Sequence, residues 1–155
     1  MRLTDILQPG CVKVPLESQS KEEAIYELVE LLCKQAGIAK PEQLKQAVWE
    51  RESTRTTGIG HGIAIPHGKS DNVDALRMAI GRTAQPVEFG AIDNKPVDLI
   101  LLLASPADQT GPHIQALAKI SRMLTDEAFR TVMRQAATGE DLYQQIVQHE
   151  AEAAV

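Results

Sequence analysis

Apolar residues at helical spacing predict five helices along the chain. Ser20 to Glu23 reads S-K-E-E, which is typical of a capping box, and Gly37 suits the end of the helix that follows. Further helix starts are predicted at Pro41, at Thr110 to His113, at Thr125 and at Thr138 to Asp141. The residues expected to share one face of a helix are Ala24, Ile25, Leu28, Leu31 and Leu32; Leu44, Ala47, Val48 and Arg51; Ile114, Leu117, Ala118, Ser121 and Leu124; and Leu142, Ile146 and Val147.

Shorter apolar runs without helical spacing predict strands. These runs are Cys11 to Val14, Ile63 to Ile65, Met78 to Ala84 and Val97 to Ala104, and a helical turn is expected before them at Thr4 to Leu7. The run from Val97 is continuously apolar, which indicates burial on both faces of a sheet. Helices therefore surround a small sheet of about four to six strands, and the predicted class is α/β with a mixed sheet.

Composition narrows the class of protein. The 155 residues fit one domain, expected over residues 1–150, with a frayed tail over residues 151–155. A net charge of -5, no Lys/Arg block and few aromatic residues argue against nucleic acid as the main partner. No stretch approaches the roughly 18 apolar residues of a membrane span, and the N-terminus shows no apolar signal core. We therefore expect a cytoplasmic protein, with Cys11 and Cys33 as buried free thiols.

One segment carries most of the chemical information. Residues 56–69 read T-T-G-I-G-H-G-I-A-I-P-H-G-K, a glycine-rich run followed by a short apolar strand. Pro66 lacks an N–H donor and is expected to stop that strand, which leaves His67 at a strand end before a flexible glycine. A histidine held in this way suits a nucleophile or a ligand, although an ordinary surface or core histidine fits the local pattern equally well. The glycines of the segment are Gly58, Gly60, Gly62 and Gly68.

Three other side chains could join His67. His113 lies at a predicted helix start, where unpaired N–H groups attract anions, but an exposed first-turn residue is an equally simple interpretation. Arg51 is near the end of the second predicted helix and suits a forked contact with phosphate, although a cation at a helix C-terminus is common. His61 lies in the glycine-rich loop and is more simply a solvated residue. Two histidines that can be neutral, an arginine and glycines make up the parts of a phosphoryl site.

Competing motifs fit the same region less well. In Gly62 to Ser70, five residues rather than four precede the Gly-Lys-Ser, so the segment is not a nucleotide P-loop. A zinc site from His61, His67 and His113 remains an alternative by count, although no closely spaced ligand pair is present. The serine-hydrolase sequence G-x-S-x-G is absent from the chain.

Three segments together resemble one protein family. They are T-G-I-G-H-G-I-A-I-P-H-G-K at residues 57–69, A-I-D-N-K-P-V-D-L-I at 91–100, and P-A-D-Q-T-x-x-H at 106–113. They are similar to enzyme IIA of the bacterial phosphotransferase system, mannitol/fructose type, and most similar to its nitrogen-regulatory branch. The resemblance extends from the first turn to about Val147. It implies a single domain with a mixed sheet of about five strands and helices on both sides.

The resemblance also implies roles for individual residues. His67 would be phosphorylated on Nε2, His113 would stabilise the phosphoryl group and Arg51 would neutralise its charge. Backbone amides around Gly58, Gly60, Gly62 and Gly68 would complete the cradle, with no metal and no cofactor. The donor would be a histidine-containing phosphocarrier protein, and the acceptor a regulatory target protein or a IIB component. His61 occupies a variable position where asparagine is frequent, and the loop at Arg55 and Thr56 departs from the family pattern.

Overall fold

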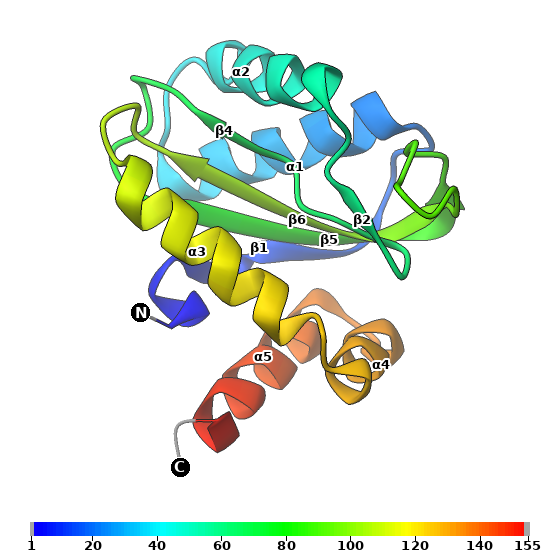
Figure 1. The fold of residues 1–155 in the computed structure, drawn as a ribbon. Coiled ribbons are helices and arrows are strands. Elements are labelled where there is room, and N and C mark those ends of the chain that lie inside the picture. The colour runs from blue at the N-terminus through cyan, green and yellow to red at the C-terminus, as the bar shows by residue number, and fades with distance from the viewer. Residues whose placement is uncertain (1, 154–155) are drawn as a thin grey trace.

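A mixed β-sheet lies between two layers of helices in the computed structural model, which describes residues 2–153 (Figure 1). The elements in chain order are η1 (Leu3–Asp5), β1 (Leu7–Leu16), α1 (Lys21–Ala36), α2 (Pro41–Thr54), β2 (Gly58–Gly60), β3 (Ile63–Ala64), β4 (His67–Lys69), β5 (Arg77–Val87), β6 (Val97–Ser105), α3 (Thr110–Met123), α4 (Glu127–Gln135) and α5 (Gly139–Ala153). The predicted class, an α/β fold with a mixed sheet and helices on both faces, is confirmed.

The sheet is organised around β6. Across residues 2–153 it has six strands in the order β1-β5-β6-β3-β2, and β4 also pairs with β6. β5 and β6 are antiparallel, whereas β1 runs parallel to β5, and β3 and β4 both run parallel to β6. All of β6 except Asp98 is buried, which confirms the expectation from its continuous apolar run. β6 is therefore the buried strand with which both β3 and β4 pair.

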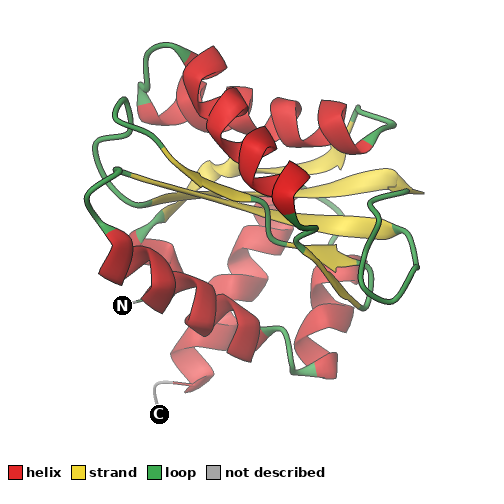
Figure 2. Cartoon of the chain, turned by 45° about the horizontal axis from the view of Figure 1, so that its top comes forward, coloured by secondary structure: helices red, strands yellow, loops and turns green. Residues whose placement is uncertain are grey.

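The helices cover opposite faces of the sheet, with α1 and α2 on one face and α3, α4 and α5 on the other (Figure 2). α1 begins where the Ser20 hydroxyl accepts the Glu23 N–H, at 3.3 Å, and ends at Gly37 in the left-handed conformation. α2 starts with Pro41 in its first turn and packs against β4. These helix boundaries agree with the capping signals in the sequence.

The expected inward face of the third helix is only partly confirmed: Leu117 and Leu124 pack in or against the core, but the other three residues do not. In α3 the buried residues are His113, Ala116 and Ile120, whereas Ile114 is 59% exposed. Ala118 and Ser121, which were expected to face inward, are also exposed, although Leu124 is buried. The predicted face leaves out His113, a polar residue at the start of the helix. Because His113 is in fact a core position, the buried face is rotated away from Ile114.

The two C-terminal helices also differ from the sequence expectation. Asp126, not Thr125, caps α4, since its carboxylate accepts the N–H groups of Ala128 and Phe129. Leu142 and Ile146 are buried in α5 as expected, but Val147 is 36% exposed. α5 continues through Ala153, so residues 151–153 of the expected tail are helical, and residues 154–155 lie outside the described part of the chain.

Glu150, near the C-terminal end of α5, connects this helix to η1. This residue is buried at 7% exposure, and its carboxylate accepts the N–H groups of Leu3 and Thr4 at 2.5 and 3.2 Å. The same contact fixes η1, which begins one residue earlier than the expected turn. A charged side chain near the end of the chain therefore satisfies buried backbone donors.

Proline has less effect on the strands than expected. β1 extends over Leu7–Leu16 rather than Cys11 to Val14, because it is an edge strand and tolerates Pro9. At Pro66 the ladder is interrupted but not ended: the Pro66 carbonyl accepts the Leu103 N–H at 3.0 Å, and pairing resumes at His67. His67 therefore begins a strand instead of following one.

Candidate functional site

A pocket of about 430 Å3 opens between α2, β4 and α3. It brings together four of the residues singled out by the sequence: Arg51, His67, Gly68 and His113. Its lining is Ala47, Arg51, His67, Gly68, Lys69, His113, Ile114 and Leu117. None of these eight described lining residues is acidic. The pocket therefore combines two imidazoles, two cations and an apolar margin, which suits an anionic group.

His67 presents one ring nitrogen to this pocket in a defined state. Its Nδ1 lies 2.9 Å from the Ile65 carbonyl oxygen, which can only accept a hydrogen bond. Nδ1 must therefore carry the proton, and in the neutral ring Nε2 keeps its lone pair. Burial is the main cause that lowers the pKa of His67, and the positive charges of Arg51 and Lys69 lower it further. Both observations favour a neutral ring in which Nε2 is the unprotonated nitrogen.

His113 lies beside His67 and is more deeply buried. The two ring centroids are 5.3 Å apart and the rings are inclined at 62°. Burial, followed by the charges of His67 and Lys69, lowers the pKa of His113 to about 4. Its Nδ1 lies 2.7 Å from the hydroxyl of Ser105, a fully buried residue at the end of β6. Ser105 lies just beyond the strand predicted at Val97 to Ala104, and no role for it is predicted from the sequence.

Two cations flank the histidines. Arg51 lies in the last turn of α2, and its Nη1 donates to the Arg55 carbonyl at 2.9 Å. Lys69 ends β4, and its Nζ donates to the Thr110 hydroxyl at 3.1 Å. Lys69 was not singled out from the sequence, although it closes the glycine-rich motif. Its place two residues after His67 in a strand puts both side chains on one face, and this spacing could have identified it.

Gly68 controls how closely α2 approaches the histidine strand. A Cβ added there would lie 2.9 Å from Cγ2 and 3.0 Å from the backbone nitrogen of Val48. Real Cβ atoms rarely come so close to backbone, so only glycine lets the helix lie directly on β4. The close approach carries Arg51 to the edge of the pocket.

The other three glycines lie elsewhere. Gly58, Gly60 and Gly62 belong to the β2–β3 hairpin, and none of them lines the described pocket. Gly62 has φ +75° and lies against the ion pair between Arg134 and Asp98. Arg134 Nη2 and Asp98 Oδ1 are 3.0 Å apart in this pair. In this position the glycines form a tight hairpin, and the structure does not bring them to His67.

His61 occupies the turn of this hairpin. Its φ is 58°, in the left-handed region that asparagine tolerates better than most residues. The side chain is exposed, the N–H is bonded to Asp93, and the carbonyl accepts from Arg134. The structure therefore does not place His61 in the pocket with His67 and His113. Within residues 2–153 no three His, Cys, Asp or Glu side chains are grouped so that they could hold a metal ion.

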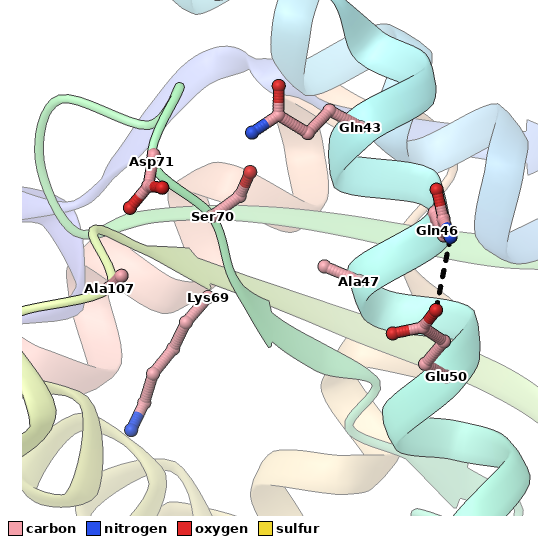
Figure 3. Close-up of a pocket in the computed structure, with 8 residues that line it drawn as sticks. All are labelled: Gln43, Gln46, Ala47, Glu50, Lys69, Ser70, Asp71 and Ala107. Atoms are coloured by element: carbon pink, nitrogen blue, oxygen red, sulfur yellow. Dashed lines mark hydrogen bonds between the residues drawn. The ribbon is translucent and has the colours of Figure 1, made fainter.

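A second, polar groove of about 280 Å3 adjoins the pocket and shares Ala47 and Lys69 with it. Its remaining lining residues are Gln43, Gln46, Glu50, Ser70, Asp71 and Ala107. Figure 3 shows the Lys69 side chain directed away from Asp71 and Gln43, and Gln46 bonded to Glu50 at 3.1 Å. Lys69 thus lines both the pocket and this groove, and its charge is one of the causes that lower the pKa of His67 and of His113.

The family model described as phosphoenolpyruvate-dependent sugar phosphotransferase system, EIIA 2, matches residues 5–149. The chain belongs to this family. A nitrogen regulatory protein of Escherichia coli (strain K12) is 40% identical over 153 residues, which cover 97% of this chain and 92% of that protein. The fructose-specific EIIABC component of Bacillus subtilis (strain 168) is 33% identical over 150 residues, 97% of this chain but only 24% of that protein.

Solved structures agree with this assignment. The crystal structure of the nitrogen regulatory protein IIA-Ntr from Neisseria meningitidis superposes with a TM-score of 0.85 at 28% identity, covering 93% of this chain and 98% of that one. The mannitol IIA structure from Escherichia coli shares the fold. It superposes with a TM-score of 0.75 at 23% identity, covering 90% of this chain and 97% of that one.

No helix within residues 2–153 has the length and apolar character needed to span a bilayer.

Proposed function

We propose that this protein is a phosphohistidine carrier in which His67 accepts a phosphoryl group on Nε2. The donor in this proposal is the phosphohistidine of a small phosphocarrier protein, charged from phosphoenolpyruvate by enzyme I. One observation carries the proposal: the Ile65 carbonyl holds the proton on Nδ1 of His67, so that Nε2 keeps a lone pair beside the pocket. Membership of the phosphotransferase family supports the same chemistry.

The transfer is a simple exchange of phosphorus–nitrogen bonds. Nε2 of His67 attacks phosphorus in line, and the bond between phosphorus and the donor imidazole breaks as the new bond forms. The attacking nitrogen carries no proton, so no carboxylate base is needed. The low pKa of His67 supports this step, because the ring is neutral at pH 7.

The surrounding groups stabilise the transferred charge. His113 would donate a hydrogen bond to a phosphoryl oxygen, and Arg51 and Lys69 would balance the negative charge. Of the cradle glycines, Gly68 lines the pocket, so we propose its amide as the local backbone contact. Gly58, Gly60 and Gly62 would act at a distance, by shaping the hairpin that leads into β3.

The apolar margin would seat the partner. Ile114 is 59% exposed beside the pocket, with Leu117 and Ala47 next to it. A partner that covers these side chains would exclude water during transfer and limit hydrolysis of the phosphohistidine. Because a carrier must release each partner, we expect a small and transient interface.

A regulatory role is the first choice for the output. The relatives that are 39–40% identical across nearly the whole chain are named nitrogen regulatory proteins. We therefore propose a cytoplasmic regulator whose contacts with target proteins change when His67 is phosphorylated. The added negative charge would repel an acidic partner, and its desolvation would weaken contact with an apolar one. In the alternative, supported by the fructose-specific relative, the phosphoryl group passes to a separate IIB protein.

One reconstitution tests the carrier function. The protein is incubated with phosphoenolpyruvate, enzyme I and the phosphocarrier protein, and the acid-labile modification is mapped by mass spectrometry. The expected result is one phosphoryl group on His67 that requires all three components. Modification of another residue, or none, would contradict the proposal.

A second incubation separates the outputs. Phosphorylated protein is mixed with a purified IIB domain, and loss of the label from His67 is followed. Rapid transfer would favour the sugar role. Binding to a target that depends on phosphorylation, without transfer to IIB, would favour regulation. Binding that ignores phosphorylation but is lost on surface mutation would favour a pure binding regulator.

A further inference from the structure

Ser105 is a buried polar residue in direct contact with the site, and nothing above gives it a function. It ends β6, has no exposed surface, and its hydroxyl lies 2.7 Å from Nδ1 of His113. We propose that Ser105 is a positioning residue whose hydroxyl donates a hydrogen bond to Nδ1 of His113 and so keeps the single ring proton on Nε2. This inference rests on the proposed carrier function and names the tautomer that the function requires.

The position of the Ser105 hydroxyl is determined by the sheet. Ser105 pairs with Lys69 in the parallel ladder between β4 and β6, and its carbonyl accepts the Ser70 N–H at 3.0 Å. The backbone that carries the hydroxyl is therefore tied to the strand that carries His67. His67 is thus oriented by the Ile65 carbonyl, two residues before it, and His113 by the Ser105 side chain at the end of β6, the strand with which β4 pairs.

The direction of the hydrogen bond follows from the two edges of the His113 ring. Nδ1 faces Ser105 in the core, which leaves Nε2 as the ring nitrogen for the pocket that His113 lines. Phosphoryl oxygens only accept hydrogen bonds, so Nε2 must carry a proton to contact one. A neutral imidazole has a single N–H, and Nδ1 must then accept. Since a serine hydroxyl can donate or accept, it can donate the hydrogen bond that Nδ1 accepts.

The two histidines would then be opposite tautomers. His67 donates from Nδ1 to a carbonyl and keeps a lone pair on Nε2 for attack. His113 accepts at Nδ1 from a hydroxyl and keeps a proton on Nε2 for stabilisation. The Ile65 carbonyl can only accept a hydrogen bond from His67, whereas the Ser105 hydroxyl can donate one to His113. These partners would therefore assign the nucleophile role to one imidazole and the hydrogen-bond donor role to the other.

The decisive measurement needs no mutation. Long-range nitrogen–proton correlation spectra of the nitrogen-15-labelled protein near pH 7.5 report which ring nitrogen of each histidine is protonated. The expected result is a protonated Nδ1 in His67 and a protonated Nε2 in His113. A protonated Nδ1 in His113 would overturn the proposal, whatever any variant does.

Variants connect the tautomer to transfer. Ser105→Ala is expected to mix the tautomers of His113 and to slow phosphoryl uptake by about tenfold, the effect of one hydrogen bond. Ser105→Thr retains the hydroxyl in a strand position and should remain within about twofold of the parent. Ser121→Ala, a serine change on the exposed face of α3, serves as the matched control and should leave the rate unchanged.

A double mutant distinguishes positioning from a general packing role. In a His113→Ala background, Ser105→Ala should cause no further loss, because the group through which Ser105 acts is gone. Slowing by the same factor in both backgrounds would overturn the proposal. The carrier function is scored separately: absence of label on His67 in the parent would refute it, whereas a labelled parent with a protonated Nδ1 on His113 would refute only the role of Ser105.

Discussion

An added methyl group would meet different surroundings at Gly62 and at Gly68, although both belong to the same glycine-rich segment. At Gly62 it would lie 2.7 Å from the Arg134 guanidinium and 2.8 Å from the Asp98 carboxylate, in a hairpin outside the pocket. At Gly68 it would lie 3.0 Å from the backbone of α2, beside His67. The first half of the segment shapes a turn, and the second half builds the pocket. Residues within one motif can therefore be required for unrelated physical reasons.

The sharpest test of this division compares the two histidines of the segment. His67→Ala is expected to abolish uptake of phosphate from the donor while the fold stays intact, because the attacking nitrogen is lost. His61→Asn should take up label at the parental rate, since asparagine tolerates the φ of 58° in the hairpin turn. Uptake is measured with labelled phosphoenolpyruvate, enzyme I and phosphocarrier. Label on the alanine variant would exclude His67 as the acceptor. An asparagine variant that takes up no label would indicate that His61 in the hairpin belongs to the site.

His113 provides the next largest effect. His113→Ala should slow transfer by about 100-fold, the usual consequence of losing one hydrogen-bond donor to a developing charge. Labelling should still be detectable, because the nucleophile on β4 remains. Single-turnover rates with the phosphorylated donor measure the change. Rates equal to those of the parent would exclude His113 from the mechanism.

Much of the fold follows from local signals in the chain. The cap at Ser20, the stop at Gly37 and the apolar run of β6 all lie where the sequence predicts them. These features depend on a few neighbouring residues, and each has one dominant physical cause. The mixed sheet with helices on both faces then follows from the number and order of the elements.

The errors arise where polar residues are buried. The sequence does not show that His113 and Glu150 are buried, and the predicted inward face of α3 omits His113 while the predicted tail includes residues 151–153 of α5. Each residue satisfies a distant partner, Ser105 in one case and the amides of η1 in the other. Sequence spacing does not show such long-range hydrogen bonds. The same reason explains why Ser105 was missed.

The two glycines yield a pair of stability predictions. Gly68→Ala should lower the free energy of unfolding by about 1–3 kcal/mol, since Val48 and its backbone must move. Gly62→Ala should cost a similar or smaller amount, through the strained φ of +75° and displacement of two flexible side chains. Only Gly68→Ala should also slow transfer by folded protein, because it displaces the helix that carries Arg51.

Urea unfolding and uptake per folded molecule measure the two effects separately. Gly111→Ala is the matched control: nothing lies within 4 Å of the added Cβ, and no loss of stability is expected. Slower transfer in Gly62→Ala, together with normal transfer in Gly68→Ala, would contradict the assignment of Gly68 to the pocket and of Gly62 to the hairpin alone.

The last prediction is a dependence of stability on pH that originates in the pocket and has no effect above about pH 6.5. The pKa of His113 is lowered to about 4 by burial, whereas an exposed histidine titrates near 6.5. Between these values the unfolded chain binds a proton that the folded protein does not. The stabilising contribution is therefore complete above about pH 6.5 and decreases as the pH falls toward 4. The lowered pKa of His67 acts in the same direction.

A variant without the titrating ring isolates this contribution. His113→Gln should show a shallower loss of stability between pH 6.5 and 4, by at most about 1.4 kcal/mol per pH unit, the slope for one proton. Urea midpoints of parent and variant over this range give the difference, in which the carboxylates common to both proteins cancel. Parallel curves would mean that His113 gains its proton equally well in the folded protein. Burial would then not be the factor that keeps this ring neutral beside His67.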